Sequence, residues 1–60
     1  MTGQELTSLR KALALTQVDF AAQLGLHPIT VSNYERGEHP IPRAVEMAAK
    51  SLKTEEKETK

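Results

Sequence analysis

The chain has 60 residues, with eight basic and eight acidic side chains, so its formal net charge is zero. This length accommodates one small domain, and the lack of cysteine excludes disulfides and thiolate zinc sites. No apolar run approaches the length of a membrane span and residues 1–5 lack the features of a signal peptide, so we expect a cytoplasmic protein.

The first predicted element is an amphipathic helix from about Gly3 to Ala14. Thr2 and Glu5 form a capping-box pattern, which favours a helix start at this point. Apolar residues then follow at i, i+3 and i+7, namely Leu6, Leu9 and Leu13. This spacing places them on one helix face, which we expect to pack into a core.

A second helix is predicted to end at Leu24. Thr16, followed three residues later by Asp19, repeats the start signal and makes Thr16 the N-cap. The residues expected to face inward are Val18, Phe20, Ala21 and Leu24. Gly25 comes directly after them, where the chain is expected to turn with a positive φ and a side chain would clash.

The third helix is expected to run from Pro28 to about Arg36, with His27 as a mediocre N-cap. Proline suits the first helical position because its missing N–H would have no intrahelical partner there. Gly37 is predicted to be the left-handed C-cap. Residues 38–42 should form an extended loop, since two closely spaced prolines disfavour helix before the second.

A fourth helix is predicted to open at Pro42 and to end near Leu52 or Lys53. Its apolar stripe comprises Ile41, Val45, Ala48 and Leu52, flanked by Met47 and Ala49. Residues 54–60 have no apolar side chain to bury. We therefore expect a domain over residues 1–53, followed by a charged tail over 54–60 that is either a frayed helical extension or flexible.

Arg10 lies within the apolar stripe of the first helix, where an unpaired charge would be costly. Glu35 follows Tyr34 on the inner side of the third helix and is likewise out of place on a solvated surface. We therefore predict an Arg10–Glu35 ion pair that ties the first helix to the third.

Residues 17–36 fit a helix-turn-helix motif: Ala21 is small where the two helices would cross, and Gly25 makes the turn. The positions facing the common core are Phe20, Leu24, Leu26, Val31 and Tyr34. An αα-hairpin in a small bundle has similar apolar spacing. The small, glycine and aromatic positions together, with an exposed helix that carries hydrogen-bonding side chains, favour a DNA-binding unit. One tyrosine and one phenylalanine are too few for a single-strand-binding surface.

No constellation in the sequence indicates catalysis. Ser32 and His27 are hydrolase residue types, but neither an acidic orienting residue nor a glycine-rich nucleophile turn accompanies them. His27 and His39 also lack the i, i+4 spacing of a helical metal pair. We expect a protein that is not an enzyme and that needs neither a metal nor another cofactor.

Three segments, at residues 15–17, 24–26 and 31–37, together with the helix that follows them, resemble the Cro and phage-repressor (XRE-like) helix-turn-helix family over about residues 6–52. The resemblance implies a lambda-repressor-like, all-α bundle of four or five short helices. It also implies binding of operator DNA, usually as a homodimer, with the third helix in the major groove. By position, it implies base contacts by Gln17, Pro28, Ile29, Ser32 and Asn33, and phosphate contacts by Thr16, His27, Thr30, Arg36, His39 and Arg43.

Two features depart from the family pattern. Pro28 and Ile29 stand where relatives often have hydrogen-bonding residues, so base recognition should depend more on methyl contacts and DNA shape. The charged tail replaces the fifth apolar helix of many relatives, which reduces the usual dimer surface.

We expect a sequence-specific binder of double-stranded DNA that acts as a small, repressor-like transcriptional regulator. The neutral charge, which is unusual for such a domain, leaves two alternatives open. One is an antitoxin-type module that binds a protein partner, and the other is a structural or vestigial fragment of a larger chain.

Overall fold

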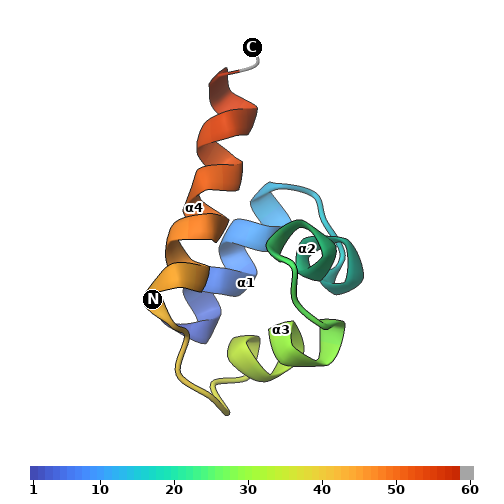
Figure 1. Ribbon diagram of the computed structural model, residues 1–60, viewed down its shortest axis with the longest axis vertical. Helices are drawn as coiled ribbons and strands as arrows, with labels where there is room; N and C mark the ends of the chain where they lie inside the picture. Colours follow the sequence, from blue (N-terminus) through green and yellow to red (C-terminus); the bar gives the residue numbers. More distant parts are fainter. Residues whose placement is uncertain (59–60) are drawn as a thin grey trace.

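The computed structural model describes the backbone of residues 1–58 and the side chains of residues 1–53. Within these residues the chain forms four helices and no strand, which confirms the predicted all-α fold. They are α1 (Gly3–Ala12), α2 (Gln17–Leu24), α3 (Pro28–Glu35) and α4 (Arg43–Glu58). The first three helices and the start of α4 form the body, and the rest of α4 projects beyond it (Figure 1). None of the helices within residues 1–58 combines the length and hydropathy that a membrane span requires.

Both helix starts predicted from threonine caps are present. The Thr2 hydroxyl accepts a bond of 3.1 Å from the Glu5 backbone N–H, and the Glu5 carboxylate accepts one of 2.8 Å from the Thr2 N–H. Thr16 accepts a bond of 3.1 Å from the Asp19 backbone N–H at the start of α2. The predicted end of α1 was wrong by two residues, because Ala14 adopts a left-handed conformation with φ of 59°.

Gly25 ends α2 with φ of 72°, as expected, and Leu26 N–H donates back to the Ala21 carbonyl at 2.8 Å. The expected clash was wrong, since a Cβ at Gly25 would meet no atom within 4 Å. The left-handed backbone itself is therefore what favours glycine at this turn.

α3 begins at Pro28, and its N-cap is His27, whose Nδ1 accepts a bond of 3.1 Å from the Ile29 N–H. The helix ends at Glu35, one residue before the predicted end, and Gly37 has φ of 78°. α4 continues five residues past Lys53, so residues 54–58 extend the helix. The rest of the predicted tail, residues 59–60, lies outside the described residues.

All four helices contribute to one core. Its buried residues are Leu6 from α1, Leu13 just after α1, Phe20 and Ala21 from α2, Val31 from α3 and Ala49 from α4. The other predicted core positions of the motif, Leu24, Leu26 and Tyr34, are partly buried against this cluster.

Two side chains do not face the core as predicted. Val18 is 61% exposed, because it lies about 100° along the helical wheel from Gln17 and away from the face that buries Phe20 and Ala21. On α4 the prediction placed Ala48 in the apolar stripe and Ala49 beside it. The structure shows the reverse: Ala49 is fully buried and Ala48 is exposed. Since the two have identical side chains, what distinguishes them is which face of α4 packs against α1 and α2.

Candidate nucleic-acid interface

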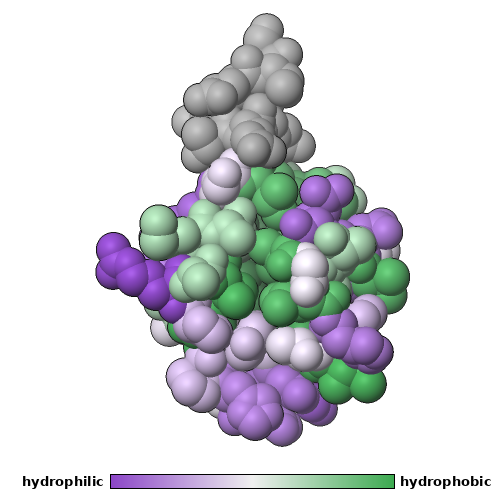
Figure 2. Space-filling view, in the orientation of Figure 1, coloured by the Kyte–Doolittle hydropathy of each residue, from purple (hydrophilic) through white to green (hydrophobic). Residues whose placement is uncertain are grey.

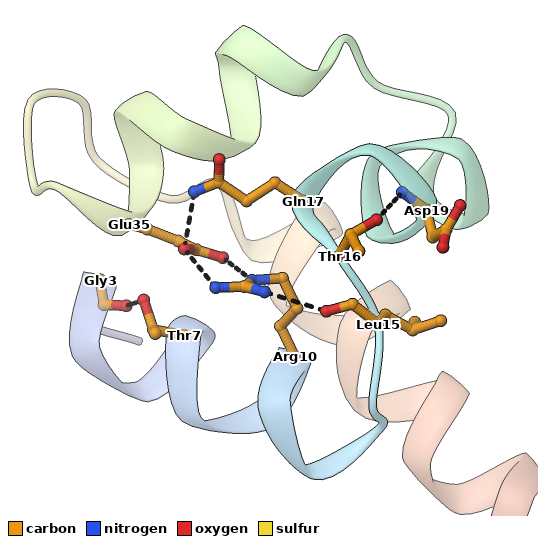
Figure 3. A network of polar contacts seen from close by, with 8 residues as sticks. All are labelled: Gly3, Thr7, Arg10, Leu15, Thr16, Gln17, Asp19 and Glu35. Atoms are coloured by element: carbon orange, nitrogen blue, oxygen red, sulfur yellow. Dashed lines mark hydrogen bonds and ion pairs between the residues drawn. The ribbon is translucent and has the colours of Figure 1, made fainter.

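The orientation of α3 is set by a polar network at its C-terminal end (Figure 3). Arg10 of α1 donates from Nε to Oε2 of Glu35 at 2.7 Å and from Nη2 to Oε1 at 3.3 Å. The predicted ion pair is therefore present, with side chains only 14% and 6% exposed. The third nitrogen of Arg10, Nη1, donates to the Leu15 carbonyl at 2.9 Å, so the same guanidinium also holds the connection from α1 to α2.

Gln17 belongs to this network, although the family resemblance implied a DNA contact for it and no role within the fold. Its Nε2 donates to Glu35 Oε1 at 3.0 Å, which joins the start of α2 to the end of α3. The amide oxygen of Gln17 points away from Glu35 (Figure 3). A signal for this role exists in the sequence: Gln17 begins the i, i+3, i+4, i+7 series that continues with Phe20, Ala21 and Leu24, so it lies on the inward face of α2.

The network keeps Glu35 ionised. Burial acts to raise the pKa of the Glu35 carboxyl, but hydrogen bonds from Arg10 and Gln17, together with the Arg10 charge, outweigh it and hold the pKa below its ordinary value. A carboxylate that accepts bonds from both α1 and α2 fixes α3 relative to two other helices.

A close backbone approach reinforces this arrangement. A Cβ added to Gly3 at the start of α1 would lie 2.6 Å from the Tyr34 carbonyl oxygen and would also overlap the Glu35 carbonyl. Thr7 Oγ1 donates to the Gly3 carbonyl at 3.0 Å within α1. The first turn of α1 therefore packs directly against the last turn of α3, a role for Gly3 that no local pattern in the sequence indicates.

The opposite side of α3 carries the predicted base-contacting residues. Ile29, Ser32, Asn33 and Arg36 follow one another at i, i+3, i+4 and i+7, so they share one helix face. Ile29 is 64% exposed, Ser32 and Asn33 are half-buried, and Arg36 lies directly after the helix as its C-cap. Pro28 is half-buried at the first position of the helix.

Two of these residues contact each other. Arg36 Nη2 donates to Asn33 Oδ1 at 2.7 Å, and Glu38 Oε2 lies 3.7 Å from the same Nη2. Asn33 and Arg36 were predicted to contact a base and a phosphate separately. The structure instead joins them into one exposed polar pair.

The remaining predicted phosphate contacts lie around α3. Thr16 and His27 are exposed N-caps that accept backbone bonds, so the Thr16 hydroxyl proton and the His27 Nε2–H are the donors they have left. Thr30 is half-buried in the first turn of α3. His39 and Arg43 are exposed, in the connection between α3 and α4 and at the start of α4. This connection, residues 36–42, lies at a mainly hydrophilic end of the molecule (Figures 1 and 2).

The positive charge near α3 is modest. Of the cations in residues 1–53, Arg10 is neutralised by Glu35, and Lys50 contacts Glu46 at 2.8 Å. Arg36 has Glu38 beside it. The positive charge that a polyanion would meet near α3 is therefore local, at Arg36 and Arg43, and not a basic field over the whole domain.

Comparison with known proteins agrees with this geometry. A model of the helix-turn-helix domain family matches residues 3–60. No curated protein and no solved structure gives a match. The family match covers nearly the whole chain, and α2, the Gly25 turn and α3 form the motif that gives the family its name. The chain therefore belongs to the helix-turn-helix domain family.

Proposed function

We propose that this domain binds double-stranded DNA in a sequence-specific manner, as a small transcriptional regulator, with α3 in the major groove. The observation that carries the proposal is the division of α3 into two sides. Glu35, at the end of its inner side, is bound by Arg10 and Gln17. The outer side presents Ile29, Ser32, Asn33 and Arg36 on one face.

An α-helix with this face fits the chemistry of the major groove, which is about 12 Å wide and displays base-specific donors, acceptors and thymine methyl groups. The exposed Ile29 side chain suits a thymine methyl group, and the Ser32 hydroxyl can donate or accept. The attachment of α3 to α1 and α2 lowers the entropic cost of binding, because the helix is already ordered before DNA binds.

Phosphate contacts are proposed at both ends of this surface. The N-termini of α2 and α4 present backbone N–H groups, which favour anions. Thr16 and His27 supply further donors, and Arg43 supplies a charge. Because the surface has few cations, we expect few phosphate contacts. Each contact contributes about −0.9 to the slope of log K against the logarithm of the salt concentration, so this slope should be shallow.

The proposed assembly on DNA is a homodimer. A single short helix reads only a few base pairs, and two copies related by a twofold axis read two half-sites about 34 Å apart. The domain would then select an inverted repeat.

Selection from a randomised duplex library, followed by anisotropy titrations at two salt concentrations, tests the proposal. We expect an enriched inverted repeat that binds more tightly than random duplex. Failure to enrich any sequence, or no binding at low salt, would refute it.

A matched pair of variants localises the binding surface. Ile29 on α3 and Met47 on α4 are similarly exposed apolar side chains, at 64% and 59%. Ile29→Ala should weaken binding to the selected duplex, whereas Met47→Ala should leave it unchanged. Equal effects of the two variants would argue against α3 as the reading helix.

One observation favours a second candidate function, binding of a protein partner. Val18 on α2 and Met47 on α4 are large apolar side chains that remain exposed, and the chain carries no net charge. Tagged wild-type protein and the Met47→Ala variant, purified in parallel from the native cell, distinguish the two functions. A stoichiometric partner that Met47→Ala loses, together with no sequence enrichment from the duplex library, would favour this alternative.

A further inference from the structure

The contact between Asn33 and Arg36 has a consequence for base recognition. Side chains on a helix lean toward its N-terminus, so Arg36 reaches back over the turn that carries Asn33. The bond from Nη2 to Oδ1 is 2.7 Å long and lies on the exposed side of α3, away from the Glu35 network. It therefore orients side chains that face solvent in the free protein.

This bond determines which way the Asn33 amide faces. A guanidinium has only donors, so the amide atom beside it has to be the oxygen. The Nδ2 amino group is then the part of Asn33 left to meet a ligand. Within residues 1–53, no acceptor is bonded to Nδ2 of Asn33 or to Nε and Nη1 of Arg36.

Adenine and guanine present different hydrogen-bonding groups to the Asn33–Arg36 pair. To bind adenine with two hydrogen bonds, asparagine must donate to N7 and accept from the N6 amino group. Arg36 already uses Oδ1, and an adenine amino group that used its second lone pair would lie beside the guanidinium charge. Guanine presents two acceptors, O6 and N7, toward the same groove and suits a surface made of donors.

We propose that Asn33 and Arg36 act together as one donor unit that selects guanine and disfavours adenine. Arg36 is the positioning residue, because it sets which part of the Asn33 amide faces the base. The proposal rests on the proposed function, in which α3 occupies the major groove, and it gives the base contact expected of Asn33 a preferred base.

The experiment repeats the duplex selection with four variants. Asn33→Ala identifies the base pair that Asn33 contacts, as the position where the selected motif loses its preference. At that position we expect guanine for the wild type. Arg36→Ala frees Oδ1, so it should shift the preference toward adenine by about tenfold, the discrimination of one paired contact.

Two further variants separate positioning from charge. Arg43→Ala also removes one cation, so it should weaken binding to all sequences without changing the preferred base. Arg36→Lys retains a cationic donor and should keep adenine disfavoured. Thermal melts of all four variants check that the fold is intact, as expected for residues outside the core.

The outcomes distinguish this proposal from the one on which it rests. If the wild type selects adenine at the Asn33 position, and Arg36→Ala selects it equally, DNA binding stands and the coupling of the two residues is refuted. The coupling is also refuted if Arg43→Ala shifts the base preference as Arg36→Ala does. If no sequence is enriched by any form of the protein, both proposals fail.

Discussion

Replacing Glu35 with alanine should remove a large part of the stability of this domain. The substitution deletes the carboxylate that accepts two hydrogen bonds from Arg10 and one from Gln17. Arg10 then keeps only its bond to the Leu15 carbonyl, with a side chain that is 14% exposed in the intact protein. The variant would leave a cation largely cut off from both water and a counter-ion.

The expected loss follows from this geometry. Breaking a buried ion pair by removing one partner costs about 3–5 kcal/mol. The remaining Leu15 bond and the partial exposure of Arg10 place the loss near the lower end, at about 3 kcal/mol. A chain of this length has a stability of about 3–9 kcal/mol, at about 0.05–0.15 kcal/mol per residue. A loss of this size should lower the midpoint of thermal unfolding by about 12–24 °C.

Urea and thermal unfolding followed by circular dichroism measure this loss. Glu38→Ala is the control, because it removes a carboxylate from an exposed pair of 3.7 Å and should cost less than about 0.5 kcal/mol. A double-mutant cycle with Arg10→Met should show a coupling of more than about 1 kcal/mol. The reasoning is refuted if Glu35→Ala costs no more than Glu38→Ala, or if the two substitutions in the cycle are additive.

Three further predictions concern the same fold. Gly3→Ala should destabilise the domain by about 1–3 kcal/mol, because the added Cβ would overlap the Tyr34 and Glu35 carbonyls. The control Ser8→Ala, at an exposed position of the same helix, should have little effect. Equal urea midpoints for the two variants would contradict this prediction. Ala14→Gly should stabilise the domain by about 0.5–1 kcal/mol in the same assay. The left-handed conformation costs alanine about 1–2 kcal/mol, and the greater freedom of glycine in the unfolded chain offsets part of the gain. A loss of stability would contradict this prediction. The pKa of Glu35 is lower in the folded protein than its ordinary value of 4.5, so the ionised carboxylate stabilises the fold above that pH, and this stabilisation is lost as the pH falls. The difference in unfolding free energy between wild type and Glu35→Gln should therefore shrink below about pH 5. A difference that stays constant down to about pH 3 would contradict this linkage.

Helix starts and the turn were predictable because their signals are local. A threonine followed by an acidic residue at the third position of the helix, or a glycine after an apolar run, satisfies backbone groups within a few residues. The Arg10–Glu35 pair was predictable for a different reason. Each residue is a charge on an apolar face, and two such misplaced charges of opposite sign satisfy each other.

The errors arise where tertiary packing decides between locally similar options. Ala14, two residues after the end of α1, adopts a conformation that alanine disfavours, and nothing near it in the sequence distinguishes it from a helical alanine. Val18 was placed inward because it is apolar, yet the phase of α2 puts the polar Gln17 there instead. The contact of Gly3 with the end of α3 joins segments about thirty residues apart, so only the fold reveals it.

The types of polar side chain on a proposed DNA-binding surface are therefore a poor guide to what it binds, unless the hydrogen bonds that they make within the protein are also known. Gln17 gives its amino group to Glu35 and keeps its oxygen, whereas Asn33 gives its oxygen to Arg36 and keeps its amino group. Two side chains with the same amide group are thus left with opposite free groups, an acceptor on Gln17 and a donor on Asn33. A positional comparison with relatives cannot distinguish them, because it transfers residue types and not the hydrogen bonds that they have already made.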